Sequence, residues 1–326
     1  MLIDEFQRVH DYLRISLIDN CNLRCNYCMP LNKTDFSPPQ NLMQADEILQ
    51  IAKIFVQLGI SKIRLTGGEP LIRKDVDLII RNLSALPIEL TLSSNGILVD
   101  RYIDLFEQAG IRSLNISLDS LDSEKFKRIT HQNYFERVFS NIQLLLERKF
   151  HVKLNVVVMR GVNDDEIIDF VQLTKLWPLH VRFIEFMPFS GNNWKTDQVF
   201  SHAEILQKLE SEFDIVKLVD GKHDTTKKFK VIGHQGTFAL ISTMTQPFCS
   251  GCNRLRLTAD GKMKNCLFSK GETDILSILR RGEDIIPSIR ANVLSKKAER
   301  GGQIMALSKL RYPENIENRS MVSIGG

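Results

Sequence analysis

The stretch RISLIDNCNLRCNYC, residues 14–28, joins a run typical of a β-strand to a loop with three cysteines. The run RISLI (14–18) predicts the strand, and Cys21, Cys25 and Cys28 follow it at the spacing C-x3-C-x2-C. Parallel α/β sheets and barrels place their active sites in loops at the carboxyl ends of the strands. The stretch therefore indicates an α/β fold with a site in this loop.

The same alternation continues along the chain. Apolar residues at helical spacing, such as Ile48, Ile51 and Phe55, separate further runs that are typical of strands. These runs are KIRLT (62–66), ELTLS (89–93), SLNISL (113–118), VKLNVVV (152–158) and VRFIEF (181–186). Six such units predict a parallel sheet, either open or curved into a barrel, and they are too few for the complete eight-unit barrel.

The pattern changes after Pro188. A polar segment, SGNNWKTDQ, is followed by a predicted helix near 201–212 and by two shorter strands, FKVIG and TFALIS. Helices are predicted again at 273–281 and 284–299. We expect one unit over residues 1–200 and an appended region over 201–326, since chains beyond about 250–300 residues usually divide.

Composition excludes several classes of protein. The 326 residues are 43% hydrophobic and 25% charged, which is ordinary for a globular protein. The 43 Lys and Arg and 39 Asp and Glu are interspersed, which argues against nucleic acid as a partner. No run of about 18 apolar residues occurs, and the acidic N-terminus lacks an apolar signal region. We predict a cytoplasmic protein without a membrane partner.

A second cysteine group, Cys249, Cys252 and Cys266, has the spacing C-x2-C-x13-C, and no cysteine lies outside the two groups. A structural zinc site usually has four ligands, so each group lacks one. Three cysteines on a four-iron cluster instead leave one iron open for a ligand that is not protein. Zinc completed by a distant histidine stays an alternative, although none of the seven histidines lies in a paired ligand motif.

The first group, with Tyr27 before its last cysteine, resembles the signature of radical S-adenosylmethionine enzymes. The segment Gly67-Gly68-Glu69-Pro70 after the second strand is similar to the glycine-rich turn of that superfamily. The resemblance implies a [4Fe-4S] cluster on Cys21, Cys25 and Cys28 whose open iron binds S-adenosylmethionine. It also implies the reductive formation of a 5′-deoxyadenosyl radical.

The second group, within CSGCNRLRLTADGKMKNC (249–266), resembles the C-terminal cluster motif of the GTP 3′,8-cyclases of molybdenum cofactor biosynthesis. This resemblance runs from Arg14 to Gly326. It implies an incomplete, six-unit TIM-like β/α barrel with a small C-terminal iron-sulfur region. It also implies a second [4Fe-4S] cluster on Cys249, Cys252 and Cys266, GTP as the substrate, and a lyase that forms the 3′,8-cyclo product in the first step of the pathway.

No G-x-x-x-x-G-K-[ST] loop is present, so side chains must hold the nucleotide. Arg254 and Arg256, two apart in an extended segment, would face the same side and suit a triphosphate. The resemblance implies GTP contacts at Arg14, Arg64, Ser93, Lys153, Arg254 and Arg256, with Arg14 also catalytic. It implies S-adenosylmethionine contacts at Tyr27, Gly68, Ser117 and Met187, and Arg182 is a further candidate for the substrate pocket. Their positions in or beside successive strands predict one cavity.

The ending Ile324-Gly325-Gly326 resembles the Gly-Gly tail that reaches into the active site in that family. Two departures are Ser93-Ser94 in place of a Thr pair, and Thr130-His131 where Thr-Gly is commoner. An electron donor is implied as a partner, with the next enzyme of the pathway, cyclic pyranopterin monophosphate synthase, as a further one. The oligomeric state, monomer or homodimer, stays open.

Two other functions remain as alternatives. A radical S-adenosylmethionine enzyme that modifies a peptide would use the second cysteine group for an auxiliary cluster, although such a cluster would favour four cysteines. A zinc protein that binds nucleic acid would use both groups structurally and would need a clustered basic surface.

Overall fold

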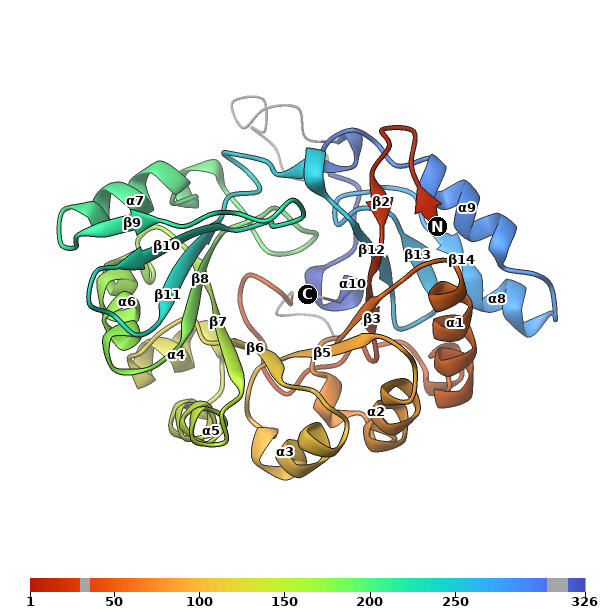
Figure 1. The fold of residues 1–326 in the computed structure, drawn as a ribbon, viewed down its shortest axis with the longest axis horizontal. Coiled ribbons are helices and arrows are strands. Elements are labelled where there is room, and N and C mark those ends of the chain that lie inside the picture. The colour runs from red at the N-terminus through yellow and green to blue at the C-terminus, as the bar shows by residue number, and fades with distance from the viewer. Residues whose placement is uncertain (30–35, 304–315, 326) are drawn as a thin grey trace.

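The computed structural model describes residues 1–29, 36–303 and 316–325. In this part of the chain, a twelve-stranded sheet has the order β14-β13-β12-β3-β4-β5-β6-β7-β8-β11-β10-β9. Figure 1 shows the sheet bent into an open curve, with helices α1 to α7 outside it and α10 near its centre. A separate two-stranded sheet at the N-terminus pairs β1 (Leu2–Ile3) with β2 (Val9–His10).

The middle of the large sheet is parallel. Its parallel strands are β3 (Tyr12–Ser16), β4 (Lys62–Thr66), β5 (Glu89–Ser94), β6 (Ser113–Ser117), β7 (His151–Val158), β8 (His180–Glu185), β11 (Thr237–Ile241) and β12 (Arg254–Leu257). The antiparallel strands at its two ends are β9 (Ile215–Lys217), β10 (Lys227–Val231), β13 (Lys262–Lys264) and β14 (Thr273–Asp274).

Amphipathic helices cover the outer face of the curve. They are α1 (Ala45–Gln57), α2 (Val76–Ser84), α3 (Val99–Gln108), α4 (Ser123–Thr130), α5 (Phe135–Glu147), α6 (Ile167–Leu176) and α7 (His202–Glu210). The C-terminal helices are α8 (Ile275–Arg280), α9 (Ile286–Leu294) and α10 (Met321–Ile324). In α1 the residues at helical spacing, Ile48, Ile51 and Phe55, are fully buried against the sheet, as the periodicity predicts.

Short 3-10 turns interrupt the loops. They span Pro39–Asn41, Pro70–Ile72, Asp164–Glu166, Thr196–Gln198, Cys249–Gly251 and Arg300–Gly302. Nowhere in the described ranges is there a helix with the length and apolar character needed to cross a membrane.

The six predicted strands form as β3 to β8, each within two residues of its expected ends. The prediction of an α/β fold with an incomplete barrel is confirmed, since no ladder among the described residues joins β11 to β12. The C-terminal part contributes more than expected, because β11 pairs in parallel with β8 and β12 with β3. The parallel region thus has eight strands rather than six, and the boundary at residue 200 stays a prediction.

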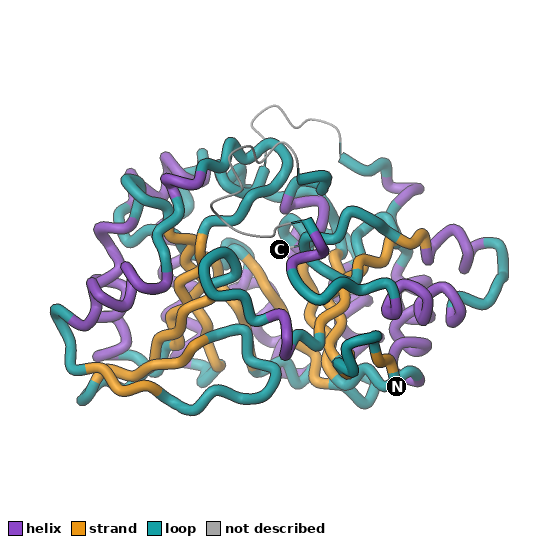
Figure 2. The backbone as a smooth tube through the Cα atoms, turned by 90° about the horizontal axis from the view of Figure 1, so that it is seen from above, coloured by secondary structure: helices purple, strands orange, loops and turns teal. Residues whose placement is uncertain are grey.

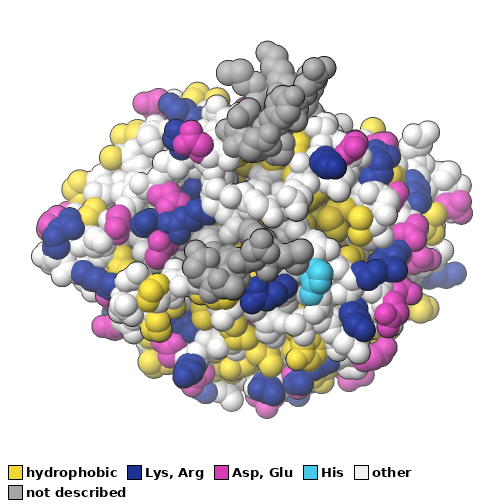
Figure 3. Space-filling view, turned by 180° about the vertical axis from the view of Figure 1, so that it is seen from behind, with side chains coloured by type: hydrophobic (Ala, Val, Ile, Leu, Met, Phe, Trp, Pro, Cys, Tyr) yellow, Lys and Arg dark blue, Asp and Glu magenta, His cyan; other side chains and the backbone are white. Residues whose placement is uncertain are grey.

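A second apolar cluster lies beside the main core of the barrel. It includes Phe189, Trp194, Phe268, Ile316 and Ile324, and so brings the end of the chain against the loops that follow β8 and β13. Figure 2 shows the end of the described chain between the two halves of the molecule. On the face seen in Figure 3, basic and acidic side chains are interspersed, which fits the mixed charges of the sequence.

Candidate active site

Two cavities meet inside the curve of the sheet. The first, of about 170 Å³, is lined by the first cysteine triplet, the turn at Gly67 and Gly68, and residues of β5 to β8. The second, of about 580 Å³, is lined by residues of β3, β4, β6 to β8 and β12. Four residues line both cavities: Asn155, Ile184, Met187 and Met321. The two cavities are therefore neighbours that share one wall.

The cysteines of the first triplet lie close enough to perturb one another. Burial raises the pKa of the Cys25 thiol well above its usual range, and the charges of Asp119, Cys28 and Cys21 add to the effect. Burial and Glu69 raise the pKa of Cys21 to about 12. Such buried thiols need a cationic group to hold them as thiolates, which is what an iron-sulfur cluster provides.

N–H donors already point at one of these sulfurs. The Leu23 backbone N–H lies 3.4 Å from Cys21 Sγ, and Asn95 Nδ2 lies 3.7 Å from it. Hydrogen bonds to cluster sulfurs are a usual feature of iron-sulfur sites. The donor set and its surroundings therefore fit the cluster that the sequence predicts.

The turn after β4 holds the cysteine loop from the other side. Gly68 donates its backbone N–H to Ile18 O at 2.6 Å. A Cβ at Gly68 would lie 2.1 Å from Asn20 O, so no other residue fits there without moving the loop. The next residue, Glu69, is buried and accepts hydrogen bonds from Leu71 N, Ser94 Oγ and Asn95 N at 3.1, 2.9 and 2.7 Å.

The residues predicted to contact S-adenosylmethionine gather as expected. Tyr27, Gly68 and Ser117 line the first cavity, and Met187 lies on the shared wall. The Tyr27 hydroxyl donates to Asp119 Oδ2 at 2.7 Å, so this carboxylate, absent from the prediction, fixes the tyrosine. Burial raises the pKa of Asp119 to about 6. Their ligand contacts stay predictions.

Ser93 is predicted to contact GTP, but it does not line the second cavity with the other predicted GTP contacts. Its side chain lines the first cavity, although Arg64 Nη1 of the second cavity approaches Ser93 Oγ to 3.5 Å. The hydroxyl therefore stands where the two cavities approach each other.

The second cavity is strongly basic. Only one carboxylic acid, Asp224, is among its described lining residues, and it lies 2.5 Å from Lys228 in an ion pair. Eight lining residues are cationic: Arg14, Lys62, Arg64, Lys153, Arg182, Lys228, Arg254 and Arg256. All the predicted GTP contacts except Ser93 are in this set, as is Arg182. A cavity of this charge suits a polyanion.

The sheet register explains how these cations meet. Arg256 of β12 pairs with Arg14 of β3, which pairs with Arg64 of β4, so three guanidinium groups come from one row across the sheet. A second row joins Lys153 of β7 to His180 of β8. Because side chains in a row share one face, the strand order alone concentrates positive charge on the inner face.

Burial and mutual repulsion dominate the electrostatics of these groups. Burial, followed by repulsion from Arg256, lowers the pKa of Arg14 well below its usual range. Burial and neighbouring arginines lower the pKa of Arg182 to about 9 and that of Arg256 to about 10. Arg182 Nε and Nη2 are buried without a hydrogen-bond partner in the described structure. Such a group of cations is stabilised by a bound anion.

Tyr12 is a member of this cavity that the sequence reasoning missed. Its hydroxyl accepts a hydrogen bond from Arg64 Nε at 2.5 Å, and its ring lies 5.6 Å from Lys62 Nζ and 5.7 Å from the Arg254 guanidinium. Burial raises its pKa, but Arg64, Arg14 and Arg254 outweigh burial and lower the value to about 7. The phenol therefore orients two of the predicted phosphate ligands.

The second cysteine triplet lies next to this cavity. Its flanking residues Phe248, Asn253 and Leu267 line the wall, and the charges of Cys252 and Cys266 perturb Cys249. Lys296 Nζ lies 3.6 Å from Cys252 Sγ. Although burial raises the pKa of Cys252, Lys296 and Arg254 lower it more, so the net shift is downward. The donor set thus fits a second cluster.

The whole cysteine set is unpaired by disulfides, with all six thiols free. Within the described ranges, no three His, Cys, Asp or Glu side chains converge on a point that holds a single metal ion.

The tail predicted to reach the site does so as far as it is described. Met321 of α10 lines both cavities, and Arg256 Nη1 donates to Gly325 O at 2.5 Å. Gly325 has φ 85°, and a Cβ there would lie 2.7 Å from Thr66 Oγ1. Glycine is therefore required at this position. Gly326, the second glycine of the predicted tail, lies outside the described residues.

The departure at His131 has a structural explanation. His131 is the C-cap of α4 and has φ 57° and ψ 22°, the left-handed conformation that favours glycine. Its Nε2 lies 2.5 Å from Asn26 Oδ1 in the cysteine loop. The turn keeps the geometry of a Thr-Gly ending, and the histidine adds a contact to that loop.

Several lining residues could have been found from strand alternation. Tyr12 lies two residues before Arg14, and Asn155 lies two residues after Lys153, so each shares a face with a predicted residue. Asn155 Oδ1 is buried without a partner in the described structure and faces the wall that both cavities share. Met321 carried no such signal, because the tail has no periodic pattern.

Comparison with known proteins agrees with this site. The family model for the Radical SAM superfamily matches residues 15–174, and the one for Molybdenum Cofactor Synthesis C matches residues 179–301. The structure of Streptococcus suis SuiB bound to S-adenosylmethionine has a TM-score of 0.66 at 14% identity, covering 97% of this chain and 77% of that one. The fold, the cysteine loop and the family match define a radical S-adenosylmethionine protein.

Relatives in sequence identify the branch. The mitochondrial GTP 3′,8-cyclase of Arabidopsis thaliana is 44% identical over 333 residues, which cover 100% of this chain and 84% of that protein. The GTP 3′,8-cyclase of Listeria welshimeri is 37% identical, with 100% and 99% covered. The chain belongs to the family of GTP 3′,8-cyclases. It spans about half of molybdenum cofactor biosynthesis protein 1 of Homo sapiens, which is 42% identical over 99% of the chain and of which 51% is covered.

Proposed function

We propose that the chain is the radical S-adenosylmethionine enzyme that converts GTP to (8S)-3′,8-cyclo-7,8-dihydroguanosine 5′-triphosphate, in molybdenum cofactor biosynthesis. The observation that carries this proposal is the pair of cavities with a shared wall. One contains a cysteine triplet, and the other has eight cations and one carboxylic acid among its described lining residues. Reacting groups held on either side of one wall are placed within reach of each other.

Cys21, Cys25 and Cys28 would hold the first [4Fe-4S] cluster, with S-adenosylmethionine in the first cavity beside Tyr27 and Gly68. When bound, the cluster and S-adenosylmethionine supply the 5′-deoxyadenosyl radical that takes the ribose 3′ hydrogen of GTP. Asn155 Oδ1, buried without a partner in the described structure, is an acceptor for a ligand on the shared wall. Cys249, Cys252 and Cys266 would hold a second cluster, next to the guanine base of GTP.

The chain's cations hold the triphosphate. Arg64, Lys153, Arg254 and Arg256 would donate to phosphate oxygens, and Arg182 adds two nitrogens without partners in the described structure. Arg14, between Arg64 and Arg256 in the row, would donate to charge that develops on the purine. The buried residues Phe186 and Phe189, with the partly buried Met321, keep water from the wall between the ligands.

An isotope experiment tests the proposal. The reconstituted enzyme is incubated anaerobically with S-adenosylmethionine, dithionite and GTP deuterated at the ribose 3′ position. Deuterium in the 5′-deoxyadenosine, with conversion of GTP, is the expected result. Unlabelled 5′-deoxyadenosine and intact GTP, with iron and sulfide confirmed, would contradict GTP as the substrate and favour a peptide. The Cys21→Ser variant is the control that should give no 5′-deoxyadenosine.

The proposal also covers the reaction class, the electron donor, the fate of the product, the location and the oligomeric state. The reaction class is lyase, the one-electron reductant is a separate donor, and the product passes to cyclic pyranopterin monophosphate synthase. A cytoplasmic location and a monomer or homodimer are further predictions. Iron and sulfide analysis of a Cys249→Ser, Cys252→Ser and Cys266→Ser triple variant tests the second cluster, since the variant should lose about half of the iron.

A further inference from the structure

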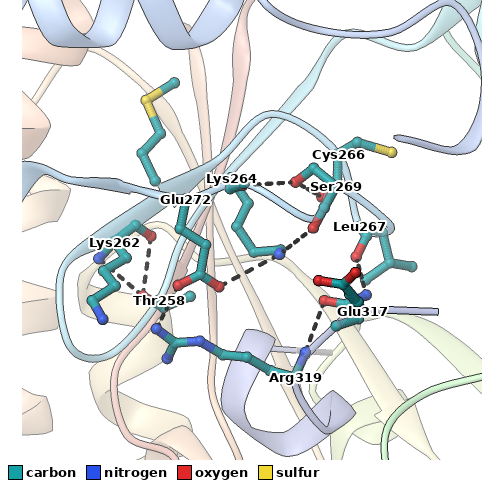
Figure 4. A network of polar contacts seen from close by, with 12 residues as sticks. Thr258, Lys262, Lys264, Cys266, Leu267, Ser269, Glu272, Glu317 and Arg319 are labelled. Carbon is teal, nitrogen blue, oxygen red and sulfur yellow. Dashed lines mark hydrogen bonds and ion pairs between the residues drawn. The ribbon is translucent and has the colours of Figure 1, made fainter. Parts of the chain in front are cut away.

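The end of the described chain, Ile316 to Gly325, is here called the tail segment. Its residue Arg319 is held by the carboxylates of Asp260 and Glu272, and Figure 4 shows Arg319 beside Glu272. Arg319 Nη1 and Nη2 lie 3.0 Å from Asp260 Oδ1 and Oδ2, and Nη2 also lies 2.5 Å from Glu272 Oε2. A guanidinium bound at both ends of its fork has a fixed orientation, which a single surface ion pair does not give.

The two carboxylates are themselves fixed. Asp260 lies in the turn between β12 and β13 and accepts a hydrogen bond from Thr258 Oγ1 at 2.6 Å. Glu272 lies 3.4 Å from Nζ of Lys264, whose side chain is 1% exposed and donates to Ser269 O at 2.6 Å. Arg319 supplies the positive charge that these partly buried acids require. Burial lowers the pKa of Arg319, but its hydrogen bonds to Asp260 and Glu272 and their charges outweigh burial, so the net shift is upward. The network is therefore a rigid anchor point.

The anchor is built on the same hairpin as the site. β12 carries Arg254 and Arg256, and Cys266 follows β13 by two residues. Asn318, next to Arg319, donates from Nδ2 to Leu267 O at 2.9 Å, and Leu267 lines the second cavity. One side of the hairpin thus presents site residues, while its turns hold the tail segment.

Beyond the anchor, the tail segment enters the cavities. Met321 lines both of them, two residues after Arg319. Val322 N donates to Cys28 O at 3.4 Å, and Gly325 O accepts from Arg256 Nη1 at 2.5 Å. Val322 and Ile324 are also buried there, but apolar packing is not directional, so the orientation of Met321 and Gly325 depends as well on where Arg319 fixes the segment outside.

We propose that Arg319 is a positioning residue, which fixes the tail segment so that Met321 and Gly325 complete the wall shared by the two cavities. Its catalytic consequence rests on the proposed function. With the wall complete, cleavage of S-adenosylmethionine is coupled to conversion of GTP. Without it, water and alternative ligand positions would enter, and cleavage would continue with the 5′-deoxyadenosine taking its hydrogen from buffer or protein instead of from GTP, so that no cyclised product forms.

Hydrogen exchange tests the positioning without reference to catalysis. In Arg319→Gln, exchange of the Val322, Ser323 and Gly325 amides should become about tenfold faster, while α9 keeps its protection. The Arg319→Lys variant, with one charge but no fork, should lie between wild type and Arg319→Gln. Unchanged exchange at the three amides in Arg319→Gln overturns the proposal.

The matched control is another ion pair of the tail segment, the one that its residue Glu317 makes with Lys270. Lys270 and Glu317 form an ion pair whose side chains are 64% and 63% exposed, and such pairs contribute little. Lys270→Ala should leave both the exchange rates and the activity as in wild type. If Lys270→Ala also speeds exchange at Val322, the anchor is not specific to Arg319.

Product coupling provides the second measurement. Arg319→Gln should lower the ratio of cyclised GTP to 5′-deoxyadenosine several-fold, with kcat lowered more than KM is raised. Loss of folded protein alone would lower the yields of cyclised GTP and 5′-deoxyadenosine equally and leave their ratio unchanged. An unchanged ratio therefore overturns the catalytic consequence of the proposal. In the Asp260→Asn and Arg319→Gln double variant, the ratio of cyclised GTP to 5′-deoxyadenosine should be no lower than in either single variant, because both changes break the same contact. If the wild type does not convert GTP, the proposed function fails, but hydrogen exchange still decides the positioning.

Discussion

The Arg182 side chain is a cation that its surroundings destabilise. It is partly buried in β8 and lines the second cavity, and its Nε and Nη2 are buried without partners in the described structure. Burial and the charges of Arg64 and Arg254 lower its pKa to about 9, although Tyr12 acts in the opposite direction. A side chain that served only the fold would not be kept in this state, so its electrostatics point to an anionic ligand.

Replacing Arg182 with methionine should therefore have two opposite effects. The Tm of the ligand-free protein should rise, because a buried unpartnered cation is removed. The KM for GTP should rise about 10- to 100-fold, as expected for loss of about 1.5–3 kcal/mol from charged hydrogen bonds. Calorimetry and steady-state kinetics measure the two effects. Arg148→Met, at an exposed ion pair on α5, is the control and should leave KM unchanged. A lower Tm with unchanged KM would show that Arg182 is structural.

Lys153 predicts a pH dependence of GTP binding. Burial and the charges of Arg182, Arg64 and Lys62, opposed by Glu89, together lower its pKa to about 8. The ammonium is therefore charged below pH 8 and loses its charge above it, so the KM for GTP should rise as pH passes through about 8. In Lys153→Arg the step should vanish, because a guanidinium stays protonated.

Two other groups near Lys153 titrate below this range. His180 has its pKa lowered to about 3 by burial and by Arg182, so it is neutral throughout. Tyr12, with a pKa of about 7, loses its proton earlier. The Tyr12→Phe variant is therefore the control, and it should keep the step near pH 8. A profile that is flat in wild type would contradict contact between Lys153 and phosphate.

Among the loops, the turn after β4 carries the strictest steric requirement. A Cβ at Gly68 would meet Asn20 O at 2.1 Å and Asn20 C at 2.5 Å, which are backbone atoms of the cysteine loop. Gly68→Ala should displace that loop and lower affinity for S-adenosylmethionine by about tenfold or more. Equilibrium dialysis with iron analysis measures this. Gly271→Ala, where a Cβ would meet nothing within 4 Å, is the control. Wild-type affinity in Gly68→Ala would exclude the turn from the site.

The strands and their loops could be predicted from the sequence because each obeys a local rule. VKLNVVV alternates in burial along β7, and KIRLT forms β4 with the expected ends. The spacing of the first cysteines and the turn at Gly67-Gly68 likewise predicted residues that line the first cavity. Tyr12 and Asn155 were missed although strand alternation places them on the same face as Arg14 and Lys153. Asp119 was missed because its partner Tyr27 lies in a loop far away along the chain.

The extension of the sheet by β11 and β12 could not be predicted for a related reason. TFALIS and RLRL read as strands of an appended region, and nothing local shows that they pair with β8 and β3. Parallel pairing between segments more than 200 residues apart, as for Arg254 and Tyr12, leaves no periodic signal. The same pairing brings Arg254 and Arg256 to Arg14, so the long-range contact that extends the sheet also builds the second cavity.

The sheet therefore predicts that residues 1–200 do not fold alone. Without β11 and β12, the parallel strands β8 and β3 become open edges, and buried residues such as Phe183 and Leu13 lose their cover. A fragment of residues 1–200 should aggregate or lack a cooperative urea transition.

The two tryptophans, Trp177 and Trp194, both lie in that part, so fluorescence reports on it alone, while far-ultraviolet circular dichroism reports on the whole chain. In the full-length protein the two signals should change at one urea midpoint, as for a single cooperative unit. Co-expression with residues 201–326 should restore the transition to the fragment. Two separate midpoints in the full chain, or a fragment as stable as the intact protein, would instead establish a domain boundary at residue 200.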